Sequence, residues 1–137
     1  MPPALVNDIM QQQIVTIGAG DSLSTLEDII TLGRVRHMPV VQGGHLVGVV
    51  TERDLLRASL SNLTARPPSE RRAFLQVVEV TQVMSAPPIT VEPHETVKNA
   101  ARVMAEHKIG CLPVVQLDEL IGLVTETDVL QHFASLP

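Results

Sequence analysis

Two short motifs in this chain could bind a ligand, because each sets a threonine three residues before an aspartate at an expected helix start. The pairs are Thr51 with Asp54 and Thr125 with Asp128. A carboxylate in the first turn of a helix can accept two hydrogen bonds, and a cis diol such as that of ribose offers two donors. The threonine hydroxyl and the free N–H groups beside it suit a phosphate. The alternative is that both pairs only cap their helices, as these residue types commonly do.

The two motifs belong to a repeat, since a shift of 74 positions aligns residues 6–56 with residues 80–130 without a gap. The densest match sets Pro39-Val40-Val41-Gln42 over Pro113-Val114-Val115-Gln116, and GVVTERDLL over GLVTETDVL. A solenoid would need shorter units in at least three copies. The repeat therefore indicates two copies of one small α/β unit, each too small to bury its apolar surface well alone. We expect the copies to pack on each other and function to lie where they meet.

Each copy is expected to fold as β-α-β-β-α, preceded in the chain by a short helical turn. The first helix begins after Asp21 or Ser22 in copy one and after Glu95 or Thr96 in copy two, and Gly33 is expected to close the first of them. Apolar residues at positions i, i+3, i+6 and i+7 give each of these helices one buried face. The other expected elements are turns at 6–10 and 80–84, extended segments at 14–17 and 89–91, hairpins at 38–41 with 46–50 around Gly43-Gly44 and at 112–115 with 120–124 around Asp118-Glu119, and helices after Thr51 and Thr125.

The segment between the copies, residues 57–79, has a different character. Arg66-Pro67-Pro68-Ser69 should end any helix running on from Asp54, because proline disfavours helical geometry in the residue before it. Glu70-Arg71-Arg72 is expected to be a solvated charged stretch, followed by apolar residues at 74–78. We interpret the segment as an ordered linker. The expected domains are residues 1–60 (with the lead-in), a linker at 61–79, and residues 80–137.

The composition argues against several classes of function. Of 137 residues, 45% are hydrophobic and the formal net charge is −5, which does not indicate a basic nucleic-acid surface. Phe74 and Phe133 are the only aromatic residues, too few for a row of rings that stacks bases. The single Cys111 excludes an intrachain disulfide and fits a reducing compartment. No apolar run approaches the roughly 20 residues of a membrane span, and no signal peptide is evident, so we expect a cytosolic protein.

These features together resemble a tandem pair of CBS domains, the Bateman module. The resemblance covers residues 4–134, and both copies carry the apolar-Pro-Val-Val strand and the Gly-apolar-apolar-Thr-x-x-Asp junction at the same spacing. It implies two repeats that pack pseudo-symmetrically through their sheets. It also implies a regulatory module without a covalent cofactor, which binds AMP, ADP, ATP or S-adenosylmethionine in clefts between its domains. No nucleophile paired with a base is apparent, so we do not expect an enzyme.

The resemblance further implies where a ligand touches the chain. In the family, residues just before the apolar-Pro-Val strand line the cleft and often contact phosphate, and adenine bonds to backbone near the first extended segment. The expected ligand-binding residues are accordingly Thr51, Asp54, Arg36, His37, Arg53, Val15 and Thr16 from copy one, and Thr125, Asp128, Ile89, Thr90, Gly110 and Cys111 from copy two.

The two copies differ in positive charge. Arg36 and His37 correspond to Gly110 and Cys111, and Arg53 corresponds to Thr127. An arginine can bind phosphate through two parallel hydrogen bonds, so we expect a phosphorylated ligand to prefer copy one. The second cleft would be empty or would borrow Arg36. Arg34 is better explained as part of a solvated edge.

Other residues indicate assembly and exclude a metal site. His45, His94, His107 and His132 lack metal-ligand spacing, so they are expected to be scattered surface residues. The second helices carry more apolar residues than the partner repeat can cover, namely Leu55, Leu56, Leu60, Val129, Leu130 and Phe133. We therefore expect a homodimer, no membrane or nucleic-acid partner, and a regulated protein that the sequence does not identify. The alternative function is a dimeric interaction scaffold that needs no ligand.

Overall fold

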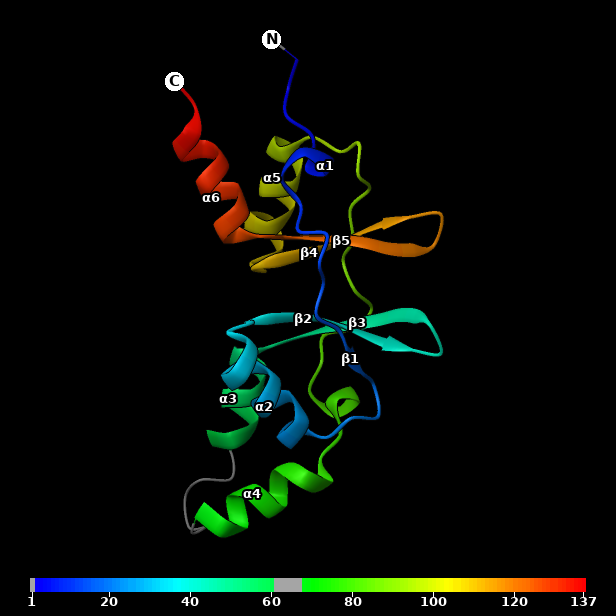
Figure 1. Ribbon diagram of the computed structural model, residues 1–137, viewed down its shortest axis with the longest axis vertical. Helices are drawn as coiled ribbons and strands as arrows, with labels where there is room; N and C mark the ends of the chain where they lie inside the picture. The colour runs from blue at the N-terminus through cyan, green and yellow to red at the C-terminus, as the bar shows by residue number, and fades with distance from the viewer. Residues whose placement is uncertain (1, 61–67) are drawn as a thin grey trace. The chain divides into compact units, whose positions relative to one another are not determined.

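A computed structural model describes residues 2–60 and 68–137 of the chain (Figure 1). It has the mixed α/β architecture expected from the sequence. No helix within these residues is long and apolar enough to cross a membrane. The elements in chain order are α1 (Val6–Ile9), β1 (Ile17–Gly18), α2 (Leu23–Gly33), β2 (His37–Gln42), β3 (His45–Thr51), α3 (Glu52–Leu60), α4 (Pro68–Val77), the 3-10 helix η1 (Val80–Gln82), α5 (Val97–His107), β4 (Cys111–Gln116), β5 (Glu119–Thr125) and α6 (Glu126–Ser135).

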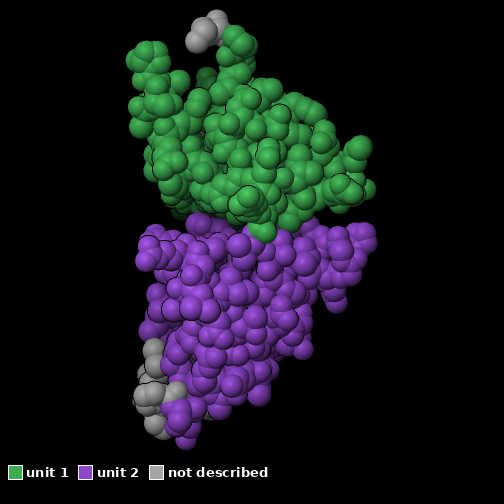
Figure 2. All heavy atoms as spheres, in the orientation of Figure 1, with its two compact units in different colours: residues 1–14, 89–137 green, residues 15–88 purple. Residues whose placement is uncertain are grey.

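The chain forms two compact units (Figure 2). Each unit contains the lead-in segment of the other sequence copy. Unit 1 comprises residues 1–14 and 89–137, and unit 2 comprises residues 15–88. Thus α1, which begins the first sequence copy, belongs to the unit that holds the second copy. The 3-10 helix η1, which begins the second copy, belongs to the unit that holds the first. The domain boundaries expected at residues 60 and 80 follow the repeat in the sequence, whereas the compact units divide the chain after residues 14 and 88.

Unit 2 is built on a three-stranded sheet of order β1-β2-β3, in which β1 is parallel to β2 and β2 is antiparallel to β3. The expected extended segment at 14–17 is reduced to the two-residue strand β1. The predicted apolar face of α2 supplies Leu23 and Leu26 to the core, both fully buried. Met38, Val40 and Val50 of the sheet are buried with them. Burial of the α2 face explains why its apolar residues recur with helical spacing.

Unit 1 repeats this plan around the hairpin β4-β5. Its extended segment is shorter still, because only the isolated parallel bridge between Val91 and Val114 forms there. Ala19 in unit 2 donates its N–H to Val41, but Pro93 stands at the matching position and has no N–H, so the ladder ends. The core of unit 1 contains Val6, Val91, Ala100, Met104, Leu112, Val114 and Val124.

The helix ends resolve the capping alternatives left by the sequence. Ser22 caps α2 by accepting a hydrogen bond from the N–H of Thr25, and Thr96 caps α5 by accepting one from the N–H of Asn99. Helix α2 does end at Gly33, but the left-handed residue that follows it is Arg34, with φ 52°. Lys108 adopts the same conformation after α5, with φ 55°. Both copies therefore place a basic residue at the left-handed position that ends the helix.

The two hairpins turn through residues with positive φ. Gly43 and Gly44 form the first turn as predicted, with φ values of 58° and 80°. The second turn was predicted at Asp118-Glu119 but falls on Leu117 and Asp118, with φ values of 51° and 64°. Glu119 instead begins β5, where it pairs with Gln116, so the register of the strands places the turn one residue earlier.

The lead-in segments dock on a glycine of each hairpin. In unit 1, Gln11 and Leu123 exchange two backbone hydrogen bonds of 2.8 and 3.0 Å, and in unit 2, Ser85 and Val49 exchange two of 2.9 and 3.0 Å. A Cβ added to Gly122 would lie 2.5 Å from Sδ of Met10, and one added to Gly48 would lie 2.7 Å from Sδ of Met84. Both copies thus need glycine here because a lead-in segment packs directly on the strand.

The described part of the linker forms helix α4, which packs on α2. Proline suits the first position of a helix, where its missing N–H has no partner to lose, so Pro68 begins α4. Leu75 is fully buried in the core of unit 2. The preceding Arg66 and Pro67 lie outside the described residues.

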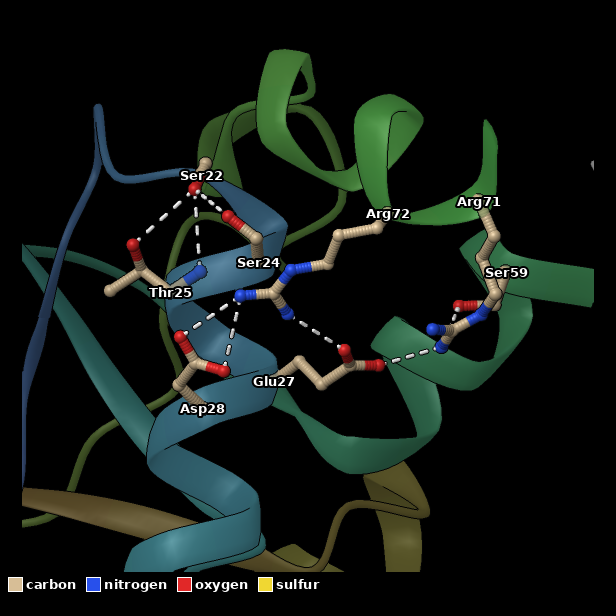
Figure 3. Close-up of polar contacts among 8 residues, drawn as sticks. All are labelled: Ser22, Ser24, Thr25, Glu27, Asp28, Ser59, Arg71 and Arg72. Carbon is tan, nitrogen blue, oxygen red and sulfur yellow. Dashed lines mark hydrogen bonds and ion pairs between the residues drawn. The ribbon is translucent and has the colours of Figure 1, made fainter. Parts of the chain in front are cut away.

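The stretch Glu70-Arg71-Arg72 was predicted to be solvated, and this holds for Glu70, which is exposed, but Arg71 and Arg72 are half-buried and paired. Arg71 donates to Glu27 at 2.7 Å, and Arg72 donates to Glu27 at 3.0 Å and to Asp28 at 3.2 Å (Figure 3). The hydrogen bond to Asp28 and its negative charge raise the pKa of Arg72 above its ordinary value. These partners lie on α2, over forty residues earlier in the chain, so the charge run alone could not reveal them.

Candidate ligand-binding junctions

In copy one, the junction between β3 and α3 is closed by two reciprocal hydrogen bonds. The N–H of Thr51 donates to Oδ2 of Asp54 at 2.9 Å, and the N–H of Asp54 donates to Oγ1 of Thr51 at 3.1 Å. Both side chains are half-buried. The capping alternative from the sequence is therefore present in the structure, and each residue satisfies an N–H that would otherwise lack a helical partner.

This cap leaves part of the carboxylate available. Oδ1 of Asp54 receives no hydrogen bond from the described residues. Because Oδ2 is held by the backbone, the orientation of Oδ1 is set by the helix start. Capping and ligand contact are thus compatible, since the cap uses one carboxylate oxygen and a hydroxyl donor could approach the other.

The register of the sheet brings further predicted residues to the same place. His37 pairs with Thr51 across β2 and β3, and the N–H of Glu52 donates to the carbonyl of Arg36 at 2.9 Å. Arg36, His37, Thr51 and Asp54 are therefore neighbours in unit 2. The N–H groups of Glu52 and Asp54 are both occupied, so the expectation of free N–H groups for a phosphate does not hold at these two positions.

The cations of copy one remain available for an anion. Arg36 and Arg53 are exposed. Neither forms an ion pair with the residues that the structure describes, in contrast to Arg71 and Arg72. Arg34 is exposed as well, as expected of a solvated edge.

In copy two, the junction between β5 and α6 has the same cap. The N–H of Thr125 donates to Oδ2 of Asp128 at 2.8 Å, and the N–H of Asp128 donates to Oγ1 of Thr125 at 3.3 Å. Cys111 pairs with Thr125 across β4 and β5, and the N–H of Glu126 donates to the carbonyl of Gly110 at 2.9 Å. Gly110, Cys111, Thr125 and Asp128 are therefore neighbours in unit 1, and Cys111 is buried.

The carboxylate of copy two has an additional partner that the sequence analysis missed. Nε2 of Gln11 donates to Oδ1 and Oδ2 of Asp128, at 3.3 and 3.2 Å. Asp128 therefore uses both oxygens, whereas Asp54 uses one. The sequence signal for this contact is that Gln11 aligns with Ser85 between the copies, so that copy one has a long amide side chain where copy two has a short hydroxyl.

The residues expected to contact adenine lie at the entry to the first strand of each copy. Val15 and Thr16 are exposed just before β1 in unit 2. In unit 1, Thr90 is exposed, and Ile89 is half-buried against the core. Within residues 2–60 and 68–137, no group of three or more His, Cys, Asp or Glu side chains could hold a metal ion.

Comparison with known proteins identifies the repeat. A family model described as CBS domain matches residues 6–61 and again residues 80–135. A CBS domain-containing protein of Dictyostelium discoideum is 31% identical over 128 residues, which is 92% of this chain and 88% of that protein. Inosine-5'-monophosphate dehydrogenase of Korarchaeum cryptofilum is 34% identical over 119 residues, but the match spans 86% of this chain and only 22% of that enzyme.

Solved structures with this fold include complexes with adenosyl compounds. The CBS domain pair of protein MJ0100, in complex with 5'-methylthioadenosine and S-adenosyl-L-methionine, has a TM-score of 0.82 and 26% identity, with 97% of this chain and 98% of that chain covered. The protein CBSX2, in complex with AMP, has a TM-score of 0.78 and 26% identity, with 96% of each chain covered.

Proposed function

Because this chain belongs to the CBS domain family, we propose that it is a regulatory module that binds an adenosyl ligand at its strand-to-helix junctions. The observation that carries the proposal is the carboxylate of Asp54, whose Oδ2 is held by the cap with Thr51 and whose Oδ1 receives no hydrogen bond from the described residues. A carboxylate fixed in this way can accept hydrogen bonds from a ribose diol without any rearrangement of the helix start. In this proposal binding alters the affinity of the module for a regulated protein, and no catalytic step takes place.

The residues around Asp54 suit the parts of a nucleotide. The ribose diol would bind Asp54, and Thr51 could donate its hydroxyl hydrogen, which no described residue uses. The exposed side chains of Arg36 and Arg53 would meet phosphate, with His37 beside them. Val15 and Thr16 would contact the base.

The second junction would offer a poorer site for a phosphorylated ligand. Thr125 and Asp128 repeat the ribose-binding pair, but Gly110 and Cys111 provide no cation. Ile89 and Thr90 would take the part of Val15 and Thr16. We therefore propose that copy one is filled first.

The chemical class of the ligand follows from what its candidates share. The structural neighbours are solved with 5'-methylthioadenosine, S-adenosylmethionine or AMP. All three compounds contain an adenosyl group with a free cis diol, so a site centred on Asp54 suits each of them. Positive charge at Arg36 and Arg53 favours adenosyl compounds that carry phosphate, such as AMP, ADP and ATP.

The direct test is calorimetric titration of the full chain with AMP, ATP and S-adenosylmethionine. Binding of at least one ligand that Asp54→Asn weakens supports the proposal, because asparagine keeps an acceptor for the cap but removes the charge. A saturating ligand at 100 times its dissociation constant should add about 2.7 kcal/mol to the free energy of unfolding. If none of the three binds, the proposed function is wrong and the ligand-independent scaffold gains support.

We also propose that the module works as a homodimer. Of the six apolar residues predicted to be uncovered, Leu55 is buried in the core of unit 2 and Val129 is half-buried against the core of unit 1, so the prediction is wrong for these two. In unit 1, Leu130 and Phe133 of α6 are 65% and 72% exposed, and in unit 2, Leu56 and Leu60 of α3 are 56% and 55% exposed. Exposed apolar residues in adjacent turns of a helix usually mark an interface. A pocket of about 440 Å³ opens beside α6 and is lined by Ala101, Met104, Ala105, Lys108, Ile109, Glu126, Val129 and Leu130.

The interaction scaffold has one observation in its favour. Both aspartates already serve as helix caps, so their presence in each copy could be explained by the stability of α3 and α6 alone. The regulated partner and the cytosolic location remain predictions from the sequence.

A further inference from the structure

The lead-in segments of the two copies place different side chains at equivalent backbone positions. Gln11 is held beside Leu123 by two backbone hydrogen bonds, and Ser85 is held beside Val49 by an equivalent pair. Leu123 and Val49 occupy the same position in the repeat, shortly before the Thr-x-x-Asp junction. The backbone therefore presents residue 11 and residue 85 to their junctions in the same way, and only the side chains differ.

The longer side chain reaches its aspartate. Nε2 of Gln11 lies 3.3 and 3.2 Å from the two carboxylate oxygens of Asp128. The hydroxyl of Ser85 makes no hydrogen bond with the described residues, and Oδ1 of Asp54 receives none. Serine has one heavy atom beyond Cβ and glutamine has four, so the difference follows from side-chain length.

We propose that Gln11 is a specificity-determining residue that competes with the ligand for Asp128. We call its side-chain amide, hydrogen-bonded to Asp128, the guard of the second junction. No described residue plays this part at Asp54 in the first junction. This inference rests on the proposed function, because it concerns how the same adenosyl ligand chooses between the copies. The amide N–H groups occupy the carboxylate positions that the hydroxyls of a ribose diol would need. A ligand at this junction must therefore displace Gln11 before the diol can bind Asp128.

The guard is expected to be moderate in strength. The hydrogen bonds of Gln11 are exposed, so water replaces them readily when the amide is displaced. Because the backbone bridge to Leu123 keeps the amide close to Asp128, the competition is intramolecular and does not depend on protein concentration. We expect the guard to lower affinity at the second junction about 3- to 10-fold. Copy two has no basic residue at the positions of Arg36, His37 and Arg53. This difference should also lower affinity at the second junction, but only for ligands that carry a phosphate.

Exchanging the two lead-in residues tests the inference. Gln11→Ser gives the second copy the side chain of the first, and Ser85→Gln gives the first copy the side chain of the second. The Asp54→Asn background isolates the second junction, and the Asp128→Asn background isolates the first. Titration with adenosine and with AMP separates the effect of the guard from the effect of phosphate, and thermal melting checks that each variant is folded.

The expected result is reciprocal. Gln11→Ser should tighten adenosine and AMP binding at the second junction by about 3- to 10-fold, and Ser85→Gln should weaken both at the first junction by a similar factor. If adenosine and AMP bind at Asp54 but neither exchange alters any dissociation constant, the guard is refuted while the proposed function stands. Weaker binding in Gln11→Ser would also refute it, since Gln11 would then be a ligand contact. If adenosine, AMP, ATP and S-adenosylmethionine bind no variant, the proposed function itself fails, and the inference fails with it.

Discussion

Thr51 and Asp54 hold each other through two reciprocal hydrogen bonds of 2.9 and 3.1 Å, and this arrangement orients the carboxylate at the start of α3. The bonds use Oδ2 of Asp54, Oγ1 of Thr51 and the backbone N–H groups of both residues. They leave Oδ1 outside the cap. A residue that caps a helix can therefore also be positioned for a ligand, and the two roles can be separated by measurement.

Replacing Asp54 by alanine is expected to affect binding more than folding. The loss of hydrogen bonds from the ligand to a charged acceptor should weaken nucleotide binding by about 1.5–3 kcal/mol. The loss of the cap should lower the free energy of unfolding by about 1 kcal/mol. Calorimetric titration and urea denaturation measure the two effects separately.

Thr96→Ala is the matched control for this experiment. It removes a side-chain cap at the start of α5, where the N–H of Asn99 donates to Oγ1 of Thr96 at 3.0 Å, and Thr96 belongs to neither Thr-x-x-Asp motif. It should lower stability by about as much as Asp54→Ala while leaving affinity unchanged. An Asp54→Ala variant that lost stability but kept full affinity would instead show that the aspartate is only a cap.

Replacing Arg36 by alanine should distinguish ligands by their phosphate. Arg36 is exposed and forms no ion pair with the described residues, so its guanidinium can pair with an anion. AMP affinity should fall about tenfold and adenosine affinity should hardly change, because only AMP carries a phosphate. Arg34→Asn serves as the control, since asparagine tolerates the left-handed conformation of Arg34 and removes the neighbouring charge. Equal losses for AMP and adenosine would rule out phosphate contact by Arg36.

The ion pairs between α4 and α2 should stabilise unit 2 in a salt-dependent way. Arg71→Ala removes the 2.7 Å contact with Glu27 and should lower the free energy of unfolding by about 0.5–1 kcal/mol at low ionic strength. The difference from the wild type should shrink in 1 M NaCl, where the screening length is about 3 Å. Urea denaturation at both salt concentrations checks this. A loss of stability that does not change with salt would mean that Arg71 contributes through packing of its aliphatic part.

A methyl group at Gly122 should disturb the docking of the lead-in segment. Its Cβ would lie 2.5 Å from Sδ of Met10 and 3.1 Å from the carbonyl oxygen of Gln11, so Gly122→Ala should destabilise the protein by about 1–3 kcal/mol. Gly20→Ala is the control, because nothing lies within 4 Å of the added Cβ there. That variant should be neutral or slightly stabilising. Equal unfolding midpoints for the two variants would contradict the close packing of the lead-in on β5.

The proposed homodimer predicts a mass of about twice 14.8 kDa by light scattering at micromolar concentration. Replacing Leu130 and Phe133 together by glutamate should return the mass to that of a monomer, because the charges would have to be buried in the interface. Leu117→Asn, at an exposed hairpin turn with φ 51°, is the control and should leave the mass of the dimer unchanged. A monomeric wild type would remove the basis for this interface.

The elements that the sequence predicted well depend on local or strongly periodic signals. The apolar stripe of α2, the hairpin at Gly43-Gly44 and the two-residue windows that contain the caps Ser22 and Thr96 involve residues within a few positions of each other. The choice within each window was made by the structure. The pairing of Thr51 with Asp54 spans three residues, so both the cap and its place at the end of β3 could be anticipated. The repeat strengthened each assignment, since the same signals occur 74 residues later.

The sequence by itself determined the two α/β copies, their membership in the CBS domain family and the position of a Thr-x-x-Asp motif where a strand meets a helix in each copy. Only the tertiary structure decided that the lead-in segments exchange units, that Arg71 and Arg72 pair with Glu27 and Asp28 on α2, and that Gln11 reaches Asp128. These contacts join residues that are 44 to 117 positions apart. They depend on how the chain folds back on itself, which propensity and periodicity within a short window do not encode.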